Sequence, residues 1–261
     1  MENSNVPLAR MSDFRVFAPA PAQDTISLPP AESHHLVTVN RARTGDTIIA
    51  FDGRGTEWTC ELTDARKSGA TLRVTATHTR APLPCAITLA QALPKGGVMD
   101  DIIRHATELG TARIVPLSTE RTQVHLDGDR SDKKIEKWRT TALEAAKQCG
   151  NPFLPEITGV QSLNDFLAGD SVRGAELRLV ASLHDGAKSL KRVLVDFRDA
   201  HEGRSPANVI WLVGPEGDFS PAEMAAITAA SVVPVTLGPL VLRCDTAATA
   251  ALSVLIHETT A

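Results

Sequence analysis

The sequence lacks several features that define common classes of protein. No apolar run among its 261 residues approaches the roughly 18 residues that a membrane-spanning helix needs. Its first residues do not show the basic and then apolar pattern of a secretory signal. The cysteines form no Cys-x-x-Cys pair, which argues against a zinc site or a disulfide framework; they are Cys60, Cys85, Cys149 and Cys244. We therefore expect a cytoplasmic protein without a membrane partner.

Familiar nucleotide and metal motifs are also missing. No Gly-x-x-x-x-Gly-Lys-Ser/Thr segment occurs, so a P-loop is not expected. No Gly-x-Gly-x-x-Gly opens the first βα unit, which disfavours a standard dinucleotide site and a nicotinamide-dependent oxidoreductase. The eight histidines do not cluster as metal ligands, so no metal is expected. The adjacent His34 and His35 would point to opposite sides of a strand.

A basic balance, which often marks proteins that bind nucleic acid, is absent. The formal net charge is −4, and residues 1–75 hold eight Arg and Lys against nine Asp and Glu. Any RNA-binding face is therefore expected to be a narrow patch. If the chain acts on RNA, we expect an assembled RNA–protein particle to be a better substrate than a free oligonucleotide, because the shape of the particle supplies further contacts.

The first part of the chain is typical of a small β-barrel. Short runs alternate between apolar and polar residues, as half-buried strands do. The expected strands are residues 14–17, 47–51, 58–62 and 71–75. Residues 80–84, with two prolines, are the expected linker. We therefore expect two domains, a first of residues 1–80 and a second of residues 85–261.

From residue 86 onward, strand and helix patterns alternate, which indicates an α/β domain with a parallel sheet. The expected strands are residues 87–93, 114–117, 177–182 and 209–213. Met99 lies at helical spacing with later apolar residues, and Gly110 closes that helix. A second helix runs from Ser131 to Cys149 and ends at Gly150.

Smaller features of this domain can also be predicted. Ser220 to Glu223 has the pattern of a capping box with proline at the first helical position. Asp245 or Thr246 is expected to cap the last helix. Trp138 and Trp211 are expected in the core, and Arg104 and Lys147 in solvent.

Two loops share one layout and carry the functional signal. Residues 212–221 and 237–247 each contain a short apolar run, then a Gly/Pro turn with a charged residue, then a helix start. Ligands of open α/β sheets bind beyond the carboxyl ends of the strands, and glycines allow a ligand to approach the backbone. Glu216 then orients a substrate or accepts a proton, and Arg243 contacts an anion. The simpler alternative is an ordinary turn with a solvated Glu216 and a surface Arg243.

With these loops, the sequence resembles the SPOUT superfamily of methyltransferases, and within it the uracil-N3 methyltransferases of 16S rRNA (RsmE-type). The resemblance extends over most of the chain in ordered blocks. In the first domain they are residues 33–36, 41–46 and 51–53, and in the second 95–100, 106–110, 116–121, 144–150, 214–217 and 237–247.

The resemblance implies a trefoil-knotted α/β domain preceded by a PUA-like, RNA-binding β-barrel. It also implies a homodimer that binds S-adenosylmethionine and methylates N3 of a uridine in 16S rRNA of the 30S subunit. The implied cofactor-binding residues are Leu183, Gly214, Pro215, Glu216, Gly217, Leu237, Gly238, Pro239 and Leu242. The implied RNA contacts are Arg41, Arg43 and Arg121.

The chemistry implied for this site needs no metal, because a sulfonium methyl group is already electrophilic. Uridine N3 carries a proton at neutral pH, so the site must align the reacting atoms and help to remove that proton. Arg243 is expected to stabilise the uracil anion, and Glu216 or Asp245 to orient Arg243 or accept the proton.

Two positions depart from the family pattern. Leu240 stands where the family usually has a second arginine, and Asp245 where it usually has glutamate. These changes leave open an alternative function, a non-catalytic RNA-binding or ribosome-assembly protein that keeps the fold.

Overall fold

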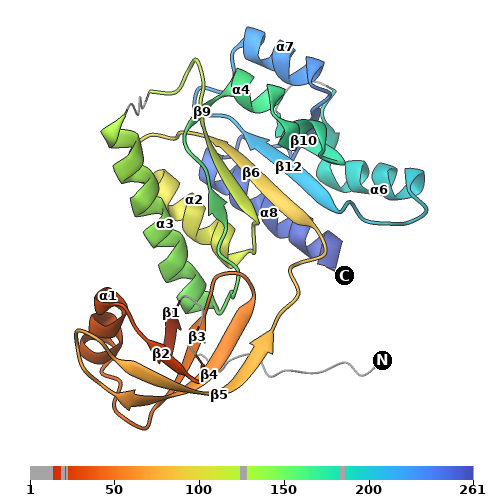
Figure 1. Ribbon diagram of the computed structural model, residues 1–261. Helices are drawn as coiled ribbons and strands as arrows, with labels where there is room; N and C mark the ends of the chain where they lie inside the picture. Colours follow the sequence, from red (N-terminus) through yellow and green to blue (C-terminus); the bar gives the residue numbers. More distant parts are fainter. Residues whose placement is uncertain (1–13, 19–20, 22, 124–127, 183–185, 261) are drawn as a thin grey trace. The chain divides into compact units, whose positions relative to one another are not determined.

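The computed structural model describes residues 14–18, 21, 23–123, 128–182 and 186–260 (Figure 1). The chain divides into two compact units. The first contains residues 1–82 and 143–154, and the second contains residues 83–142 and 155–261. Residues 143–154, which the sequence places in the second domain, therefore group with the first unit. Residues 80–84 form no helix or strand.

The first unit is built on a five-stranded sheet in the order β1-β3-β4-β5-β2. β1 and β3 are parallel, and the other neighbours are antiparallel. The strands are β1 (Phe14–Phe17), β2 (Thr25–Ser27), β3 (Thr47–Phe51), β4 (Thr56–Asp64) and β5 (Thr71–Thr79). All four expected strands are confirmed, and β2 is an addition. The closure of this sheet into a barrel stays a prediction.

His34 and His35 do not lie in a strand. They lie at the junction of α1 (Pro30–His34) and a single-turn π-helix, η1 (His35–Val39). Pro30 occupies the first helical turn, where its fixed backbone angle favours a helix start. Ser33 anchors this helix: its hydroxyl donates to the Leu28 carbonyl at 3.1 Å and accepts the Ala70 N–H at 2.9 Å.

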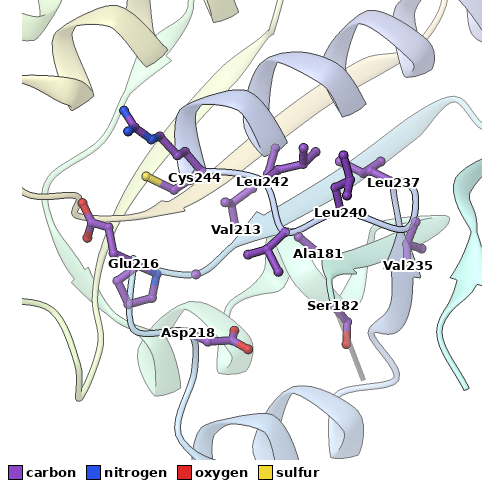
Figure 2. A pocket seen from close by; sticks show the side chains of 15 residues that line it. Ala181, Ser182, Val213, Glu216, Asp218, Val235, Leu237, Leu240, Leu242 and Cys244 are labelled. Atoms are coloured by element: carbon purple, nitrogen blue, oxygen red, sulfur yellow. The ribbon is translucent and has the colours of Figure 1, made fainter. Parts of the chain in front are cut away.

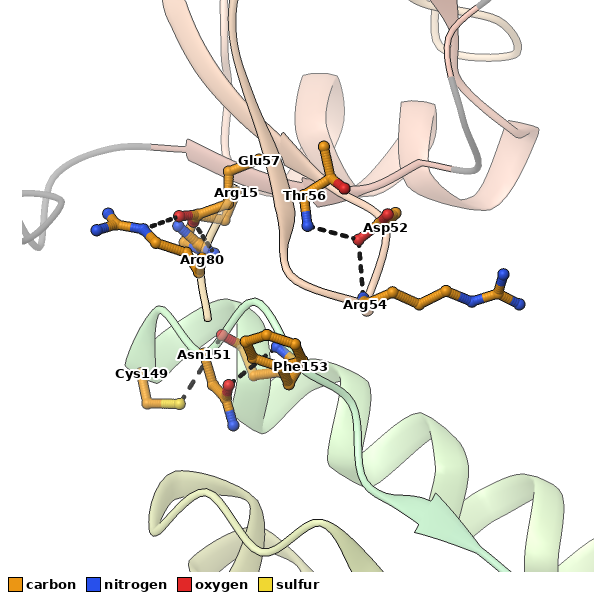
Figure 3. Close-up of polar contacts among 10 residues, drawn as sticks. Arg15, Asp52, Arg54, Thr56, Glu57, Arg80, Cys149, Asn151 and Phe153 are labelled. Atoms are coloured by element: carbon orange, nitrogen blue, oxygen red, sulfur yellow. Dashed lines mark hydrogen bonds and ion pairs between the residues drawn. The ribbon is translucent and has the colours of Figure 1, made fainter. Parts of the chain in front are cut away.

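Residues 150–154 are built into the first unit beside the turn between β3 and β4 (Figure 3). The Gly55 N–H donates to the Pro152 carbonyl at 3.1 Å, and the Leu154 N–H donates to the Gly53 carbonyl at 2.9 Å. Gly55 has a φ of +100°, and a Cβ there would lie 2.9 Å from the Arg80 carbonyl oxygen. Glycine is therefore required at this close approach of three segments.

Paired charges are buried beneath this turn (Figure 3). Glu57 is only 6% exposed, and its two carboxylate oxygens lie 2.9 Å from Arg15 Nη2 and 2.9 Å from Arg80 Nε. The Arg15 guanidinium also lies over the Phe51 ring, 5.1 Å from the ring centre. A buried carboxylate is costly unless it is paired, so these two arginines make the burial of Glu57 tolerable.

The expectation that Lys147 is solvated is wrong. Lys147 is only 8% exposed, and its ammonium donates to Glu32 Oε1 at 2.6 Å and to Glu144 Oε1 at 2.9 Å. Glu32 Oε2 also accepts the Phe17 N–H at 3.2 Å. Glu144 is three residues away on the same helix, whereas Glu32 is distant in the sequence. The burial of Lys147 therefore depends on a partner that no local pattern indicates.

The second unit is a parallel α/β domain. Its strands run in the order β11-β13-β10-β12-β6-β7-β8, with β9 also pairing with β7. Every neighbouring pair is parallel. The strands are β6 (Ala86–Ala92), β7 (Arg113–Ser118), β8 (Glu156–Ile157), β9 (Gln161–Ser162), β10 (Leu177–Ala181), β11 (Lys188–Ser189), β12 (Asn208–Val213) and β13 (Val233–Thr236). The four expected strands correspond to β6, β7, β10 and β12.

Helices bury both faces of this sheet, as the alternation along β12 shows. Trp211 belongs to one apolar cluster, and its neighbours Ile210 and Leu212 belong to another on the opposite face. The first cluster holds residues of α2, α3, α6 and α8, and the second those of α4, α5 and α7. Trp138 and Met99 lie in the first cluster, as expected. The helices are α2 (Val98–Glu108), α3 (Asp129–Cys149), α4 (Leu163–Ala168), α5 (Asp170–Arg173), α6 (Leu190–Ala200), α7 (Pro221–Ala229) and α8 (Cys244–Thr260).

The ends of these helices follow local sequence signals. Ser220 and Glu223 form the expected capping box at the start of α7. Gly150 follows α3 with a φ of +80°, the left-handed conformation of a helix C-cap. Arg104 is exposed and pairs with Asp101. Within the described residues, no helix combines the length and apolarity that a membrane crossing would need.

The buried Lys147 yields a test of stability. Lys147→Ala removes the ammonium and leaves Glu32 with an uncompensated charge, so we expect a loss of about 3 kcal/mol in the free energy of unfolding. Urea unfolding followed by tryptophan fluorescence measures this loss. Lys133→Ala, an exposed position on the same helix, should change stability by less than about 0.5 kcal/mol. Equal effects of the two variants would contradict a stabilising role for the Lys147 pairs.

Candidate functional site

A cavity of about 310 Å³ opens at the carboxyl ends of the neighbouring strands β13, β10 and β12 (Figure 2). This is the edge at which ligands of open α/β sheets usually bind. Its walls come from the strand ends and from the two loops that the sequence singles out. They are Ala181, Ser182, Val213, Gly214, Pro215, Glu216, Asp218, Val235, Leu237, Leu240, Val241, Leu242, Arg243, Cys244 and Ala247.

The loop after β12 forms one wall through a tight turn. The Asp218 N–H donates to the Pro215 carbonyl at 2.9 Å, and Asp218 adopts a φ of +59°, which is rare for a residue with a side chain. A Cβ at Gly214 would lie 3.2 Å from the ring of the buried Phe219. The turn therefore packs tightly behind the cavity and presents bare backbone to it.

Glu216 is exposed and connects two loops at this edge. Its Oε1 atom accepts the backbone N–H of Lys95 at 2.9 Å, so the carboxylate ties the loop after β12 to the loop after β6. Figure 2 shows Glu216 at the opposite end of the cavity from Leu237. One carboxylate oxygen thus holds the loops together.

The loop between β13 and α8 forms the apolar wall. Gly238 has a φ of +141°, and its carbonyl accepts the Thr236 hydroxyl at 2.9 Å. Leu240 and Val241 line the cavity but are 72% and 79% exposed. Large apolar side chains this exposed often mark a surface that a ligand or partner covers.

Arg243 and Asp245 lie at the start of α8 but differ in position. Arg243 is exposed and lines the cavity, and its carbonyl accepts the Ala247 N–H at 2.8 Å. Asp245 does not line the cavity, and its Oδ1 accepts the N–H of the next residue, Thr246, at 2.9 Å. The expectation that Asp245 or Thr246 caps α8 is wrong, because the helix begins at Cys244.

The structure brings most of the predicted cofactor residues together. Gly214, Pro215, Glu216, Leu237 and Leu242 line the cavity, and so does Arg243, which was predicted as a catalytic residue. Gly217 lines a neighbouring cavity, and Gly238 and Pro239 line neither. Leu183 lies outside the described residues.

The predicted RNA contacts belong to both units of the chain. Arg121 donates from Nη1 to the Gly217 carbonyl at 2.7 Å, so it lies at the loop after β12. Arg41 and Arg43 are exposed residues of the first unit. Among the described residues, no group of His, Cys, Asp and Glu side chains is arranged to hold a metal ion.

Several wall residues were given no individual role by the sequence analysis, although three of them lie in the two loops that it singled out. Ala181 ends β10 and Ser182 follows it, Val213 ends β12, and Val235 belongs to β13. Cys244 and Ala247 lie in the first turn of α8. The strand ends could have been located from the sequence, because each lies where an apolar run ends. Only the strand order shows that these ends lie next to one another.

Two family models match the chain. Residues 81–256 match an RNA methyltransferase domain, and residues 28–75 match an RNA methyltransferase PUA domain.

Curated relatives share one name, ribosomal RNA small subunit methyltransferase E. The protein from Synechocystis is 34% identical over 88% of this chain and 72% of its own length. The protein from Bacillus subtilis is 32% identical over 90% of this chain and 91% of its own length.

Solved structures of similar fold include proteins described as methyltransferases. A protein of that name from Neisseria gonorrhoeae, bound to S-adenosyl methionine, has a TM-score of 0.82 and 28% identity, over 93% of this chain and 96% of its own. A Legionella pneumophila protein in complex with the cofactor SAM has a TM-score of 0.83 and 31% identity, over the same shares.

The cavity thiol yields a test of its local charge. Burial raises the pKa of the Cys244 thiol above its usual value, and the negative charge of Glu216 raises it further. The thiolate therefore forms only at higher pH, so Cys244 should react with iodoacetamide more slowly than the exposed Cys149. Glu216→Gln removes the charge and should speed the labelling of Cys244 between pH 7 and 9, measured by peptide mass spectrometry.

Glu120→Gln serves as the control for this test, because Glu120 is exposed at the same edge and is not a cause of the shift. If Glu216→Gln and this control give the same labelling rate as the wild type, the charge of Glu216 does not affect the reactivity of the Cys244 thiol.

Proposed function

This chain belongs to the family of ribosomal RNA small subunit methyltransferases E, and we infer that it is an S-adenosylmethionine-dependent enzyme that methylates 16S rRNA. The observation that carries this function is the cavity at the strand ends, in a chain whose solved relatives bind that cofactor. The same relatives favour an enzyme over a non-catalytic RNA-binding protein.

The cavity fits the proposed cofactor in size and chemistry. Its volume of about 310 Å³ lies at the lower end of the usual range of ligand sites, roughly 300–1,000 Å³. Aliphatic side chains provide flat walls for an adenine ring, and the glycine loop provides backbone groups for its polar edge. When bound, S-adenosylmethionine supplies an electrophilic methyl group on a positively charged sulfur. We propose as its contacts Gly214, Pro215, Glu216, Gly217, Leu237, Gly238, Pro239, Leu242 and, outside the described residues, Leu183.

The proposed acceptor is N3 of a uridine. Its proton must leave before the nitrogen becomes a good nucleophile, and the negative charge then spreads onto the two carbonyl oxygens of the ring. Arg243 is exposed at the cavity wall and carries donors that suit those oxygens, so we assign it the stabilisation of this anion.

Glu216 is a better candidate than Asp245 to receive the proton. Glu216 lines the cavity and commits Oε1 to the Lys95 N–H, while Oε2 has no hydrogen bond within the described residues. Asp245 lies within the first turn of α8, away from the cavity walls. We assign Asp245 to the stabilisation of that turn, where a negative charge is favourable.

An assembled 30S subunit is the proposed substrate, and the cytoplasm is the proposed location. The PUA-type domain, proposed as residues 1–80, presents Arg41 and Arg43 at its surface, but its charge is balanced. A narrow basic patch alone gives weak binding to RNA, and the shape of an assembled particle adds further contacts that increase the affinity.

We also propose that the second domain, residues 85–261, is knotted and forms a homodimer. After β12 the chain reaches β13 on the far side of β10, and α8 then returns to pack against α2, β12 and β6. This path supports a threaded arrangement of the SPOUT type. The exposed Leu240 and Val241, with Val254 on α8, support an apolar contact with a second copy.

Methyl transfer tests the function. With labelled S-adenosylmethionine and 30S particles that lack the modification, we expect label in 3-methyluridine after nuclease digestion. Arg243→Ala removes the stabilisation of the anion and should lower kcat by about 100-fold or more. The dissociation constant of the Arg243→Ala variant for S-adenosylmethionine, measured by calorimetry, should change little. Label in another base, or none, would refute the proposed reaction.

The dimer has a separate test. Val254→Asp places a charge in the proposed contact and should weaken self-association at least about tenfold, measured by sedimentation equilibrium. Val39→Asp is a matched control, because Val39 is an exposed valine of the first unit. A wild-type chain that stays monomeric at micromolar concentration would rule out the dimer.

A further inference from the structure

A second cavity, of about 650 Å³, lies beside the first at the same edge of the sheet. Its walls come from the loops after β6, β7 and β12, three neighbouring parallel strands. The lining residues are Lys95, Glu120, Arg121, Thr122, Gln123, Glu216 and Gly217. Glu216 lines both cavities, so the two share a wall.

Side-chain bonds to the backbone hold the walls of this second cavity in place. The Lys95 N–H donates to Glu216 Oε1 at 2.9 Å, and the Glu120 N–H donates to Glu223 Oε1 at 2.7 Å. Arg121 Nη1 donates to the Gly217 carbonyl at 2.7 Å. These bonds connect three loops that are far apart in the sequence, so the cavity is a defined site rather than a gap between mobile loops.

The turn after β7 is reinforced in the same way. Thr119 and Thr122 are buried, and their hydroxyl groups lie 2.7 Å apart. The Thr122 hydroxyl also accepts the Thr119 N–H at 3.1 Å. This turn sets the position of Arg121 between the two threonines.

The chemistry of the second cavity differs from that of the first. None of its lining residues is aliphatic, whereas leucines and valines dominate the first cavity. The Lys95 ammonium has no hydrogen bond or ion pair within the described residues, and Arg121 commits only Nη1 to backbone carbonyls. An unpaired ammonium and the remaining guanidinium donors suit the oxygens of a phosphodiester.

We infer that this second cavity receives the nucleotide to be methylated, with Lys95 and Arg121 as contacts to its phosphates. The inference rests on the proposed function, because a methyl acceptor must lie next to the methyl donor, and this cavity shares a wall with the proposed cofactor site. The shared Glu216 then lies between cofactor and base, where a carboxylate can accept the N3 proton. The sequence placed Lys95 in a block that resembles the family but assigned it no contact.

Lys95→Ala is the sharpest variant, because the bond from Lys95 to Glu216 uses the backbone N–H and survives the substitution. We expect KM for the 30S particle to rise about tenfold, which corresponds to about 1.4 kcal/mol. The dissociation constant for S-adenosylmethionine should change less than twofold. The slope of log Kd for 30S against log salt should fall by about 1, as for one lost phosphate contact.

Two comparisons complete the experiment. Arg121→Ala should also lower the salt slope by about 1, although it removes a loop contact as well. Lys191→Ala, an exposed lysine on α6, is the matched control for loss of one positive charge and should leave the slope unchanged.

Filter binding to 30S particles separates this inference from the proposed function, because it needs no methyl transfer. If Lys95→Ala lowers the slope but the wild-type enzyme transfers no methyl group, the second cavity binds RNA and the proposed reaction fails. If the wild type methylates 30S and Lys95→Ala matches Lys191→Ala in slope and KM, the inference is overturned. It is also overturned if Lys95→Ala weakens cofactor binding as much as RNA binding.

Discussion

The parallel sheet of the second unit determines where ligands can bind. Both faces are covered by helices, so strands such as β12 bury apolar side chains on each side, and only residues at or near the strand ends, such as Val213, line a cavity. Polar side chains can serve a ligand only from the loops, and parallel pairing brings the loops after β10, β12, β6 and β7 to one edge. Two cavities form there, one apolar and one polar.

Charged residues at this edge hold loops together, and two of them, Glu216 and Arg121, also line a cavity. Glu216, Glu223 and Arg121 each bond to the backbone of another loop. A loop braced in this way loses little conformational entropy when a ligand binds, which favours affinity. A single carboxylate such as Glu216 can therefore both hold a loop in place and take part in the chemistry. The loss of activity on its removal then includes both contributions.

Local patterns predicted most of the fold, since alternation and helical spacing report burial directly. The capping box at Ser220 and the stop at Gly150 were equally local. The errors arose where distant residues decide. Lys147 is buried because Glu32, which is distant in the sequence, pairs with it. The two-residue strands β8, β9 and β11 have no pattern of their own. At the site, glycine loops marked Gly214 and Leu237, but the place of Val235 in the cavity wall required the strand order.

The assignment of residues 143–154 to the first unit bears on how this protein evolves and how it can be divided. The first unit is discontinuous: its strands are encoded before residue 83, and a further segment of it, residues 143–154, is encoded about sixty residues later. A gene fragment that ends at the linker would omit Lys147 and Leu154, the partners of Glu32 and Gly53. Recombination at the linker is therefore disfavoured, and the two domains are expected to be inherited together.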